Sequence, residues 1–83
     1  MSETTLDDDI RTVLAEFWLE LLELAEIADT DRFLELGGNS LKATMLANRI
    51  ELTWGFRPSM EVVFASSFDE LVEFCAVERG REL

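Results

Sequence analysis

The sequence contains no histidine, and this absence excludes one large class of hydrolytic sites. A Ser-His-acid relay needs an imidazole to accept the hydroxyl proton near neutral pH. A single cysteine, Cys75, cannot form an internal disulfide, and the N-terminus lacks the basic and apolar segments of a secretory signal. We therefore expect a cytoplasmic protein. Because no cluster of His and Cys is present, we expect no metal site.

Long apolar runs and basic residues are also scarce. No apolar stretch approaches the roughly 20 residues needed to cross a bilayer, so we expect no membrane-spanning segment. Seven basic residues against 18 acidic ones give a net charge of -11, which repels nucleic acid and anionic lipid. The expected partners are therefore proteins with basic patches.

What the chain does contain suits one small globular domain over residues 1–83, since 48% of the residues are hydrophobic. A chain this short buries only about 60% of its unfolded surface, so a deep catalytic cleft is not expected. We expect a monomer in which residues 1–6 and 80–83 are frayed.

Apolar spacing predicts a first helix that begins after a cap at Thr4 or Thr5 and ends near Leu24. The stripe that indicates it recurs every three or four residues: Ile10, Leu14, Phe17, Leu21 and Leu24. A second line widens this face: Ala15, Trp18, Leu22 and Ala25. The wide face is either a broad core face or a docking or self-association patch, and core is the commoner outcome.

The helical period fails over residues 25–39, which predicts a long ordered loop held to the core by Ile27, Phe33 and Leu36. Ser40 then opens a second helix that ends at Gly55 as a left-handed cap. Its predicted buried stripe is apolar throughout: Ala43, Leu46, Ala47, Ile50 and Trp54.

Two further helix starts follow. Ser59 can cap a short helix through Met60, Val63 and Phe64. The run Ser67-Phe68-Asp69-Glu70 matches a capping box, and an apolar face continues to about Val77: Phe68, Leu71, Val72 and Cys75. On that face Cys75 is expected to be a buried hydrophobe rather than a reactive thiol. The predicted fold is all-α, with three main helices and one short helix around a single core.

The segment Leu36 to Leu41, Leu-Gly-Gly-Asn-Ser-Leu, carries the strongest functional signal. Taken alone, these residues could be a loop end followed by an ordinary N-cap at Ser40. They lack the second glycine of a Gly-x-Ser-x-Gly elbow. Read from Asp31 to Ala43, however, the chain closely resembles the phosphopantetheine attachment sequence of acyl and peptidyl carrier proteins. The order of the expected helices resembles that family as well.

The resemblance implies that Ser40 bears a covalent 4'-phosphopantetheine derived from coenzyme A, flanked by Gly37, Gly38, Asn39 and Leu41. The thiol of such an arm holds aminoacyl or acyl groups as thioesters. A carrier of this kind is a substrate of a phosphopantetheinyl transferase and is not itself an enzyme. The two small glycines are expected to leave space for that transferase. A phosphodiester on Ser40 would also be favoured by the positive end of the following helix.

The flanking residues favour a peptidyl carrier of nonribosomal or hybrid peptide-polyketide synthesis. Fatty-acid carriers typically place Asp before the serine, whereas Asn39 stands here and basic residues outnumber Glu51 between residues 40 and 57. Asn39 also departs from the Asp or His common in peptidyl carriers, and Phe64 to Ser67 departs from their usual Pro-Thr link. A polyketide or fatty-acid carrier, and an acidic helical adaptor with an unmodified Ser40, are the alternatives.

The family resemblance implies several partners besides the transferase. They are an adenylating enzyme or acyltransferase that loads the arm, and condensation, ketosynthase, tailoring or thioesterase enzymes that use it. Candidate contact residues lie near the arm: Leu41, Met45, Met60 and Val63. Core burial is the alternative for Leu41, Met45 and Val63.

Overall fold

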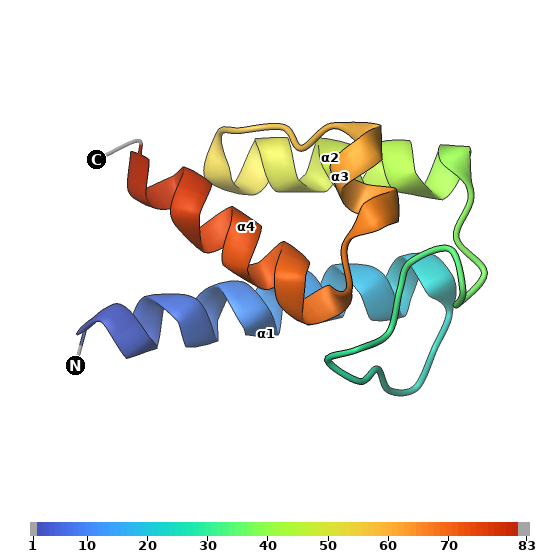
Figure 1. The fold of residues 1–83 in the computed structure, drawn as a ribbon, viewed down its shortest axis with the longest axis horizontal. Coiled ribbons are helices and arrows are strands. Elements are labelled where there is room, and N and C mark those ends of the chain that lie inside the picture. The colour runs from blue at the N-terminus through green and yellow to red at the C-terminus, as the bar shows by residue number, and fades with distance from the viewer. Residues whose placement is uncertain (1, 82–83) are drawn as a thin grey trace.

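The computed structural model describes residues 2–81, and the side chains of residues 9–80. Within residues 2–81, four helices follow one another: α1 (Ser2–Leu22), α2 (Ser40–Trp54), α3 (Met60–Ala65) and α4 (Phe68–Arg81). In Figure 1, α1 and α2 form the lower and upper edges of the molecule and α4 lies between them. Three long helices and one short one confirm the predicted all-α fold. Among residues 2–81, no helix is both long and apolar enough to cross a membrane.

Trp18 on α1 lies at the centre of the core and is fully buried. Its ring meets Phe33 from the loop and Phe68 from α4 edge to face, with centroids 5.3 and 5.2 Å apart. Phe17, which the sequence placed in the main stripe, is only half-buried and contacts Trp54. Both predicted lines of α1 nevertheless reach the core, so its wide apolar face is a core face.

The two ends of α1 differ from those predicted. The helix begins at Ser2, so Thr4 and Thr5 lie inside it and the predicted cap there is wrong. Residues 2–6 and residues 80 and 81 lie in helices, and their fraying stays a prediction. Residues 1, 82 and 83 lie outside the described part.

At its other end α1 stops at Leu22, two residues early, because Glu23 adopts a left-handed conformation with φ 57°. The Leu24 N–H then donates to the Leu19 carbonyl over 3.0 Å. This bond is the one that closes a Schellman motif, and it turns the chain into the loop.

The loop of residues 23–39 is ordered as predicted: Phe33 is buried, and Ile27 and Leu36 pack against the core. It is also joined to the start of α4. The Phe68 N–H donates to the Asp31 carbonyl over 2.8 Å, and the Asp69 N–H donates to the Asp29 carbonyl over 2.9 Å. The loop thus satisfies N–H groups at a helix start that has no intrahelical acceptors for them.

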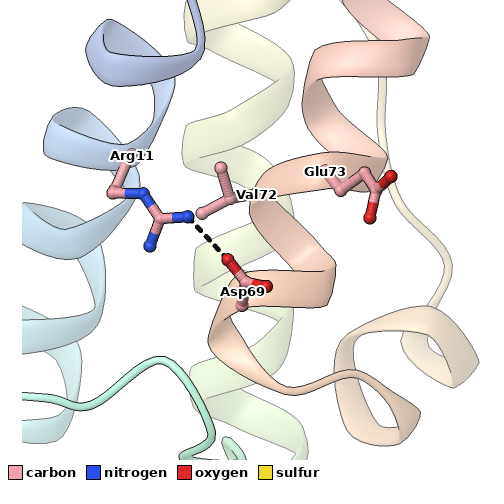
Figure 2. Close-up of a pocket in the computed structure, with 4 residues that line it drawn as sticks. All are labelled: Arg11, Asp69, Val72 and Glu73. Atoms are coloured by element: carbon pink, nitrogen blue, oxygen red, sulfur yellow. Dashed lines mark hydrogen bonds and ion pairs between the residues drawn. The ribbon is translucent and has the colours of Figure 1, made fainter.

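Arg11 adds an ionic link between α1, the loop and α4. Its guanidinium donates to Asp29 over 2.7 Å and to Asp69 over 2.6 Å. The hydrogen bond to Asp69 is the main cause that raises the Arg11 pKa above its ordinary value. Figure 2 shows this contact in a surface pocket that Val72 and Glu73 also line. The pocket contains no residue of the Leu36 to Leu41 segment, so it is no part of the candidate site.

Candidate attachment site

Asn39, rather than Ser40, caps the start of α2. Its backbone is extended, with φ -146° and ψ -177°, and its side-chain oxygen accepts the Lys42 N–H over 2.9 Å. The Asn39 carbonyl accepts the Ala43 N–H over 2.8 Å, which begins the helical ladder. Ser40 is therefore the first helical residue, and the interpretation of Ser40 as an ordinary N-cap is wrong.

The Ser40 side chain is free for chemistry. The residue is exposed, and within residues 2–81 its hydroxyl makes no hydrogen bond. Its carbonyl, in contrast, accepts the Thr44 hydroxyl over 2.9 Å inside the helix. Because Asn39 satisfies the Lys42 N–H, the Ser40 hydroxyl is not needed for the stability of the helix start.

The surroundings of Ser40 suit a permanent negative charge. The first turn of α2 contains no acidic residue, and it contains Lys42. N–H groups of the first turn have no acceptors within a helix, and the dipole there is positive. A phosphodiester linked to Ser40 is therefore compatible with the residues present, although the chain as a whole is acidic.

The two glycines before the site have different roles. Gly37 has φ 99°, and a Cβ there would meet nothing within 4 Å, so this position is open. A Cβ at Gly38 would lie 2.3 Å from Cδ2 of Phe33, and the Gly38 N–H donates to the Phe33 carbonyl over 2.9 Å. Gly38 is thus required for packing on Phe33, while its role in leaving access for a transferase stays a prediction.

The predicted partner residues separate into exposed and buried groups. Leu41 is 70% exposed and Met45 is 41% exposed, so burial is not their role. Met60 is half-buried, with its sulfur 4.0 Å from the Thr44 hydroxyl of α2. Val63 is fully buried in the core, because it lies on the face of α3 that packs inward. A direct partner contact by Val63 is therefore wrong, and its alternative, core burial, is correct.

Leu52 is a surface residue that the sequence analysis missed. It is 88% exposed on α2, the highest value among the large exposed hydrophobics of the described residues. The sequence did contain a signal for this residue. Its helical spacing from Leu41 and Met45 places Leu52 on the side of the helix opposite the predicted buried stripe.

Cys75 is fully buried, as predicted. Burial, followed by the charge of Glu78, raises the pKa of its thiol to about 12. A thiol that stays protonated is a poor nucleophile, which leaves Cys75 a packing role. Within the described part of the chain, no group of three or more His, Cys, Asp or Glu residues is placed to hold a metal ion.

Comparison with known proteins gives a consistent result. Residues 12–75 match the phosphopantetheine attachment site family. The chain is 41% identical over 58 residues to malpinin synthetase of Mortierella alpina. This match covers 70% of this chain and 1% of that protein. It is 31% identical over 77 residues to phosphinothricin tripeptide synthetase PhsC of Streptomyces viridochromogenes, and this match covers 92% of this chain and 7% of that protein. The chain thus spans only a small part of the length of these relatives.

Solved structures show the same fold. A chain in the complex of the phosphopantetheine transferase Sfp with coenzyme A and a peptidyl carrier protein superimposes with a TM-score of 0.77. The two are 28% identical, and the match covers 82% of this chain and 90% of that one. An active-site mutant peptidyl carrier protein gives a TM-score of 0.79 at 26% identity, and the match covers 86% of this chain and 80% of that one. With its match over residues 12–75, the chain belongs to the phosphopantetheine attachment site family.

Proposed function

We propose that Ser40 is the residue that bears the 4'-phosphopantetheine arm and that the chain holds aminoacyl or acyl groups on it as thioesters. The observation that carries this proposal is the exposed Ser40 hydroxyl, which makes no hydrogen bond within residues 2–81 while Asn39 caps the helix. A free hydroxyl at a positive helix start can both be reached by an enzyme and tolerate the phosphodiester.

The attachment needs a separate transferase that supplies the base. In the step, the Ser40 oxygen forms a new bond to the phosphorus next to the pantetheine of coenzyme A. The bond from that phosphorus to the nucleotide half of coenzyme A breaks, and the hydroxyl proton passes to a base of the transferase. This chain has no histidine to act as that base.

We place the carrier in nonribosomal peptide or hybrid peptide-polyketide synthesis. The support is its similarity to segments of peptide synthetases and to peptidyl carrier structures. Asn39 before the serine and Lys42 after it also differ from the acidic pattern of fatty-acid carriers. Its partners would be a transferase, an adenylating enzyme, and condensation or thioesterase enzymes. We infer a cytoplasmic location, because loading draws on coenzyme A.

Intact-mass measurement tests the assignment of Ser40. The chain is incubated with coenzyme A and the transferase Sfp, and its mass is compared with that of the Ser40→Ala variant. Ser59→Ala is the matched control, because Ser59 is also an exposed serine at a helix start and its hydroxyl caps α3 by accepting the Val62 N–H over 3.1 Å.

We expect one phosphopantetheine group on the wild-type chain and on Ser59→Ala, and none on Ser40→Ala. Helical circular dichroism of Ser40→Ala should match that of the wild type. Loading of Ser40→Ala, or no loading of the wild type, would contradict the assignment.

A further inference from the structure

Arg32 joins the loop before Ser40 to the end of α3. Its guanidinium donates a hydrogen bond to the carbonyl of Ala65, the last residue of α3, and its backbone forms an isolated antiparallel bridge with Ser67. Carbonyl groups in the last turn of a helix have no intrahelical donors, and the dipole there is negative. The last turn of α3 contains no basic residue of its own, so Arg32 supplies both a donor and a positive charge from the loop.

α3 depends on contacts of this kind because it has only six residues. An isolated helix this short is not stable in water. Val63 anchors its middle in the core, and the Ser59 side chain caps its start by accepting the Val62 N–H. Arg32 holds its end.

The contact at Arg32 lies at the start of the turn that leads to Ser40. The Arg32 carbonyl accepts the Leu36 N–H over 3.2 Å. The Gly38 N–H then donates to the Phe33 carbonyl over 2.9 Å, and this turn closes two residues before Ser40. The segment between Arg32 and Ser40 is therefore short and hydrogen-bonded, so the position of one residue constrains that of the other.

The start of α3 reaches the other side of Ser40. The Thr44 hydroxyl donates to the Ser40 carbonyl over 2.9 Å, and it lies 4.0 Å from the sulfur of Met60, the first residue of α3. Figure 1 shows α3 beside α2. α3 thus contacts the loop before Ser40 through Arg32 and the helix after it through Met60.

We propose that Arg32 is a positioning residue for the loading of Ser40, and that it acts by holding the end of α3 against the loop. The proposal rests on the attachment of the arm to Ser40. Arg32 acts through the turn of residues 32–38 and not on the reacting atoms. Without it, only a fraction of the folded chains would present Ser40 correctly, and the apparent affinity for the transferase would fall by that fraction.

Two measurements on the same four chains test this role. Loading by Sfp and coenzyme A gives KM and kcat, and amide hydrogen exchange of the unmodified chain reports on the Leu36 and Gly38 N–H groups. The chains are the wild type, Arg32→Ala, Arg32→Lys and the control Arg57→Ala. Arg57 is also an exposed arginine, but it bonds to side chains of α2 rather than to the end of α3. The two alanine variants remove the same charge, and helical circular dichroism shows whether each keeps the fold.

For Arg32→Ala we expect KM for the carrier to rise about fivefold with kcat unchanged, the value of one hydrogen bond. Exchange at Gly38 should become faster by a similar factor. Arg32→Lys should restore most of both values, because an ammonium group can also donate to the Ala65 carbonyl. Arg57→Ala should match the wild type in KM and in exchange.

Equal effects of Arg32→Ala and Arg57→Ala, or a fall in kcat alone, would overturn the proposal. A higher KM for Arg32→Ala with unchanged exchange would overturn it too, because Arg32 would then contact the transferase directly. No loading of the wild type, whatever the exchange rates, would instead contradict the assignment of Ser40, and this proposal would fail with it.

Discussion

At the scale of single residues, Asn39 caps α2 and Ser40 presents an unbonded hydroxyl in residues 2–81. The sequence alone could not tell which of the two residues is the cap. Asn and Ser are about equally favoured as N-caps, so the motif alone fits either residue in that position. The structure gives the cap to Asn39 and leaves the Ser40 hydroxyl without a hydrogen bond in residues 2–81. The proposed attachment residue is therefore not needed to cap the helix.

Stability measurements on two variants test this division. Asn39→Ala should lower the free energy of unfolding by about 1 kcal/mol, because the Lys42 N–H loses its acceptor. Ser40→Ala should change it by less than about 0.5 kcal/mol, the range for surface substitutions. Urea denaturation at pH 7 measures both values. If Ser40→Ala proved the more costly change, Ser40 would be the cap after all.

The buried thiol of Cys75 makes stability depend on alkaline pH. Its pKa is about 12 in the folded chain against an ordinary value of 9.0, so between these values the unfolded chain binds fewer protons. The free energy of unfolding should therefore fall as pH rises through this window, by about 1.4 kcal/mol per pH unit. The loss is absent below pH 9.

Urea denaturation at several pH values from 8 to 11 measures this slope, with Cys75→Ala as the control. The window contains few other titrating groups, since the chain has no tyrosine and Lys42 is its single lysine. Cys75→Ala should be less stable at pH 8 because of the cavity, but its stability should depend less on pH. Parallel slopes for the two chains would refute this role for the thiol.

At the scale of elements, helix starts were more predictable than helix ends. The capping box forms as predicted: the Glu70 N–H donates to the Ser67 hydroxyl over 3.2 Å, and the Ser67 N–H donates to Glu70 over 2.9 Å. Both partners lie within four residues, so the local sequence is sufficient. The end of α1 was missed because Glu23 adopts a left-handed conformation that its residue type disfavours. The residue type at this position therefore gave no signal for the end of the helix.

Replacing that residue tests whether the end of α1 is strained. Glu23→Gly should raise the free energy of unfolding by about 0.5 to 1 kcal/mol, because glycine adopts φ 57° without a Cβ clash. It also removes a negative charge from a helix C-terminus. Thermal and urea unfolding measure the change. In the matched control, Glu16→Gly in the middle of α1, the same substitution should destabilise by about 1 kcal/mol. A loss of stability in Glu23→Gly would show that the motif carries no strain.

At the scale of the whole molecule, the sequence predicted the helices and most of the core but not the links between distant segments. Arg11 is 18 residues from Asp29 and 58 from Asp69 in sequence, and no local pattern joins them. The same limit applies to Gly38, whose requirement for glycine arises from the Phe33 ring beneath it. Periodicity identifies which faces are apolar, whereas the partner of each face depends on the tertiary arrangement.

These links explain how an 83-residue chain presents one serine in a defined position. The loop is joined to α4 by Asp29 and Asp31, and to α1 through Phe33 on Trp18. Gly38 packs on the same Phe33, one residue before the cap of α2. The core and the loop together therefore fix the start of α2, and Ser40 is the exposed residue at that point.

The most direct test of this account is to locate the modified residue. The wild-type chain is treated with coenzyme A and Sfp, digested, and its fragments are sequenced by tandem mass spectrometry. The account predicts one phosphopantetheine group per chain, located on Ser40 in the fragment that contains it. A chain that stays unmodified, or a group found on another serine, would contradict it.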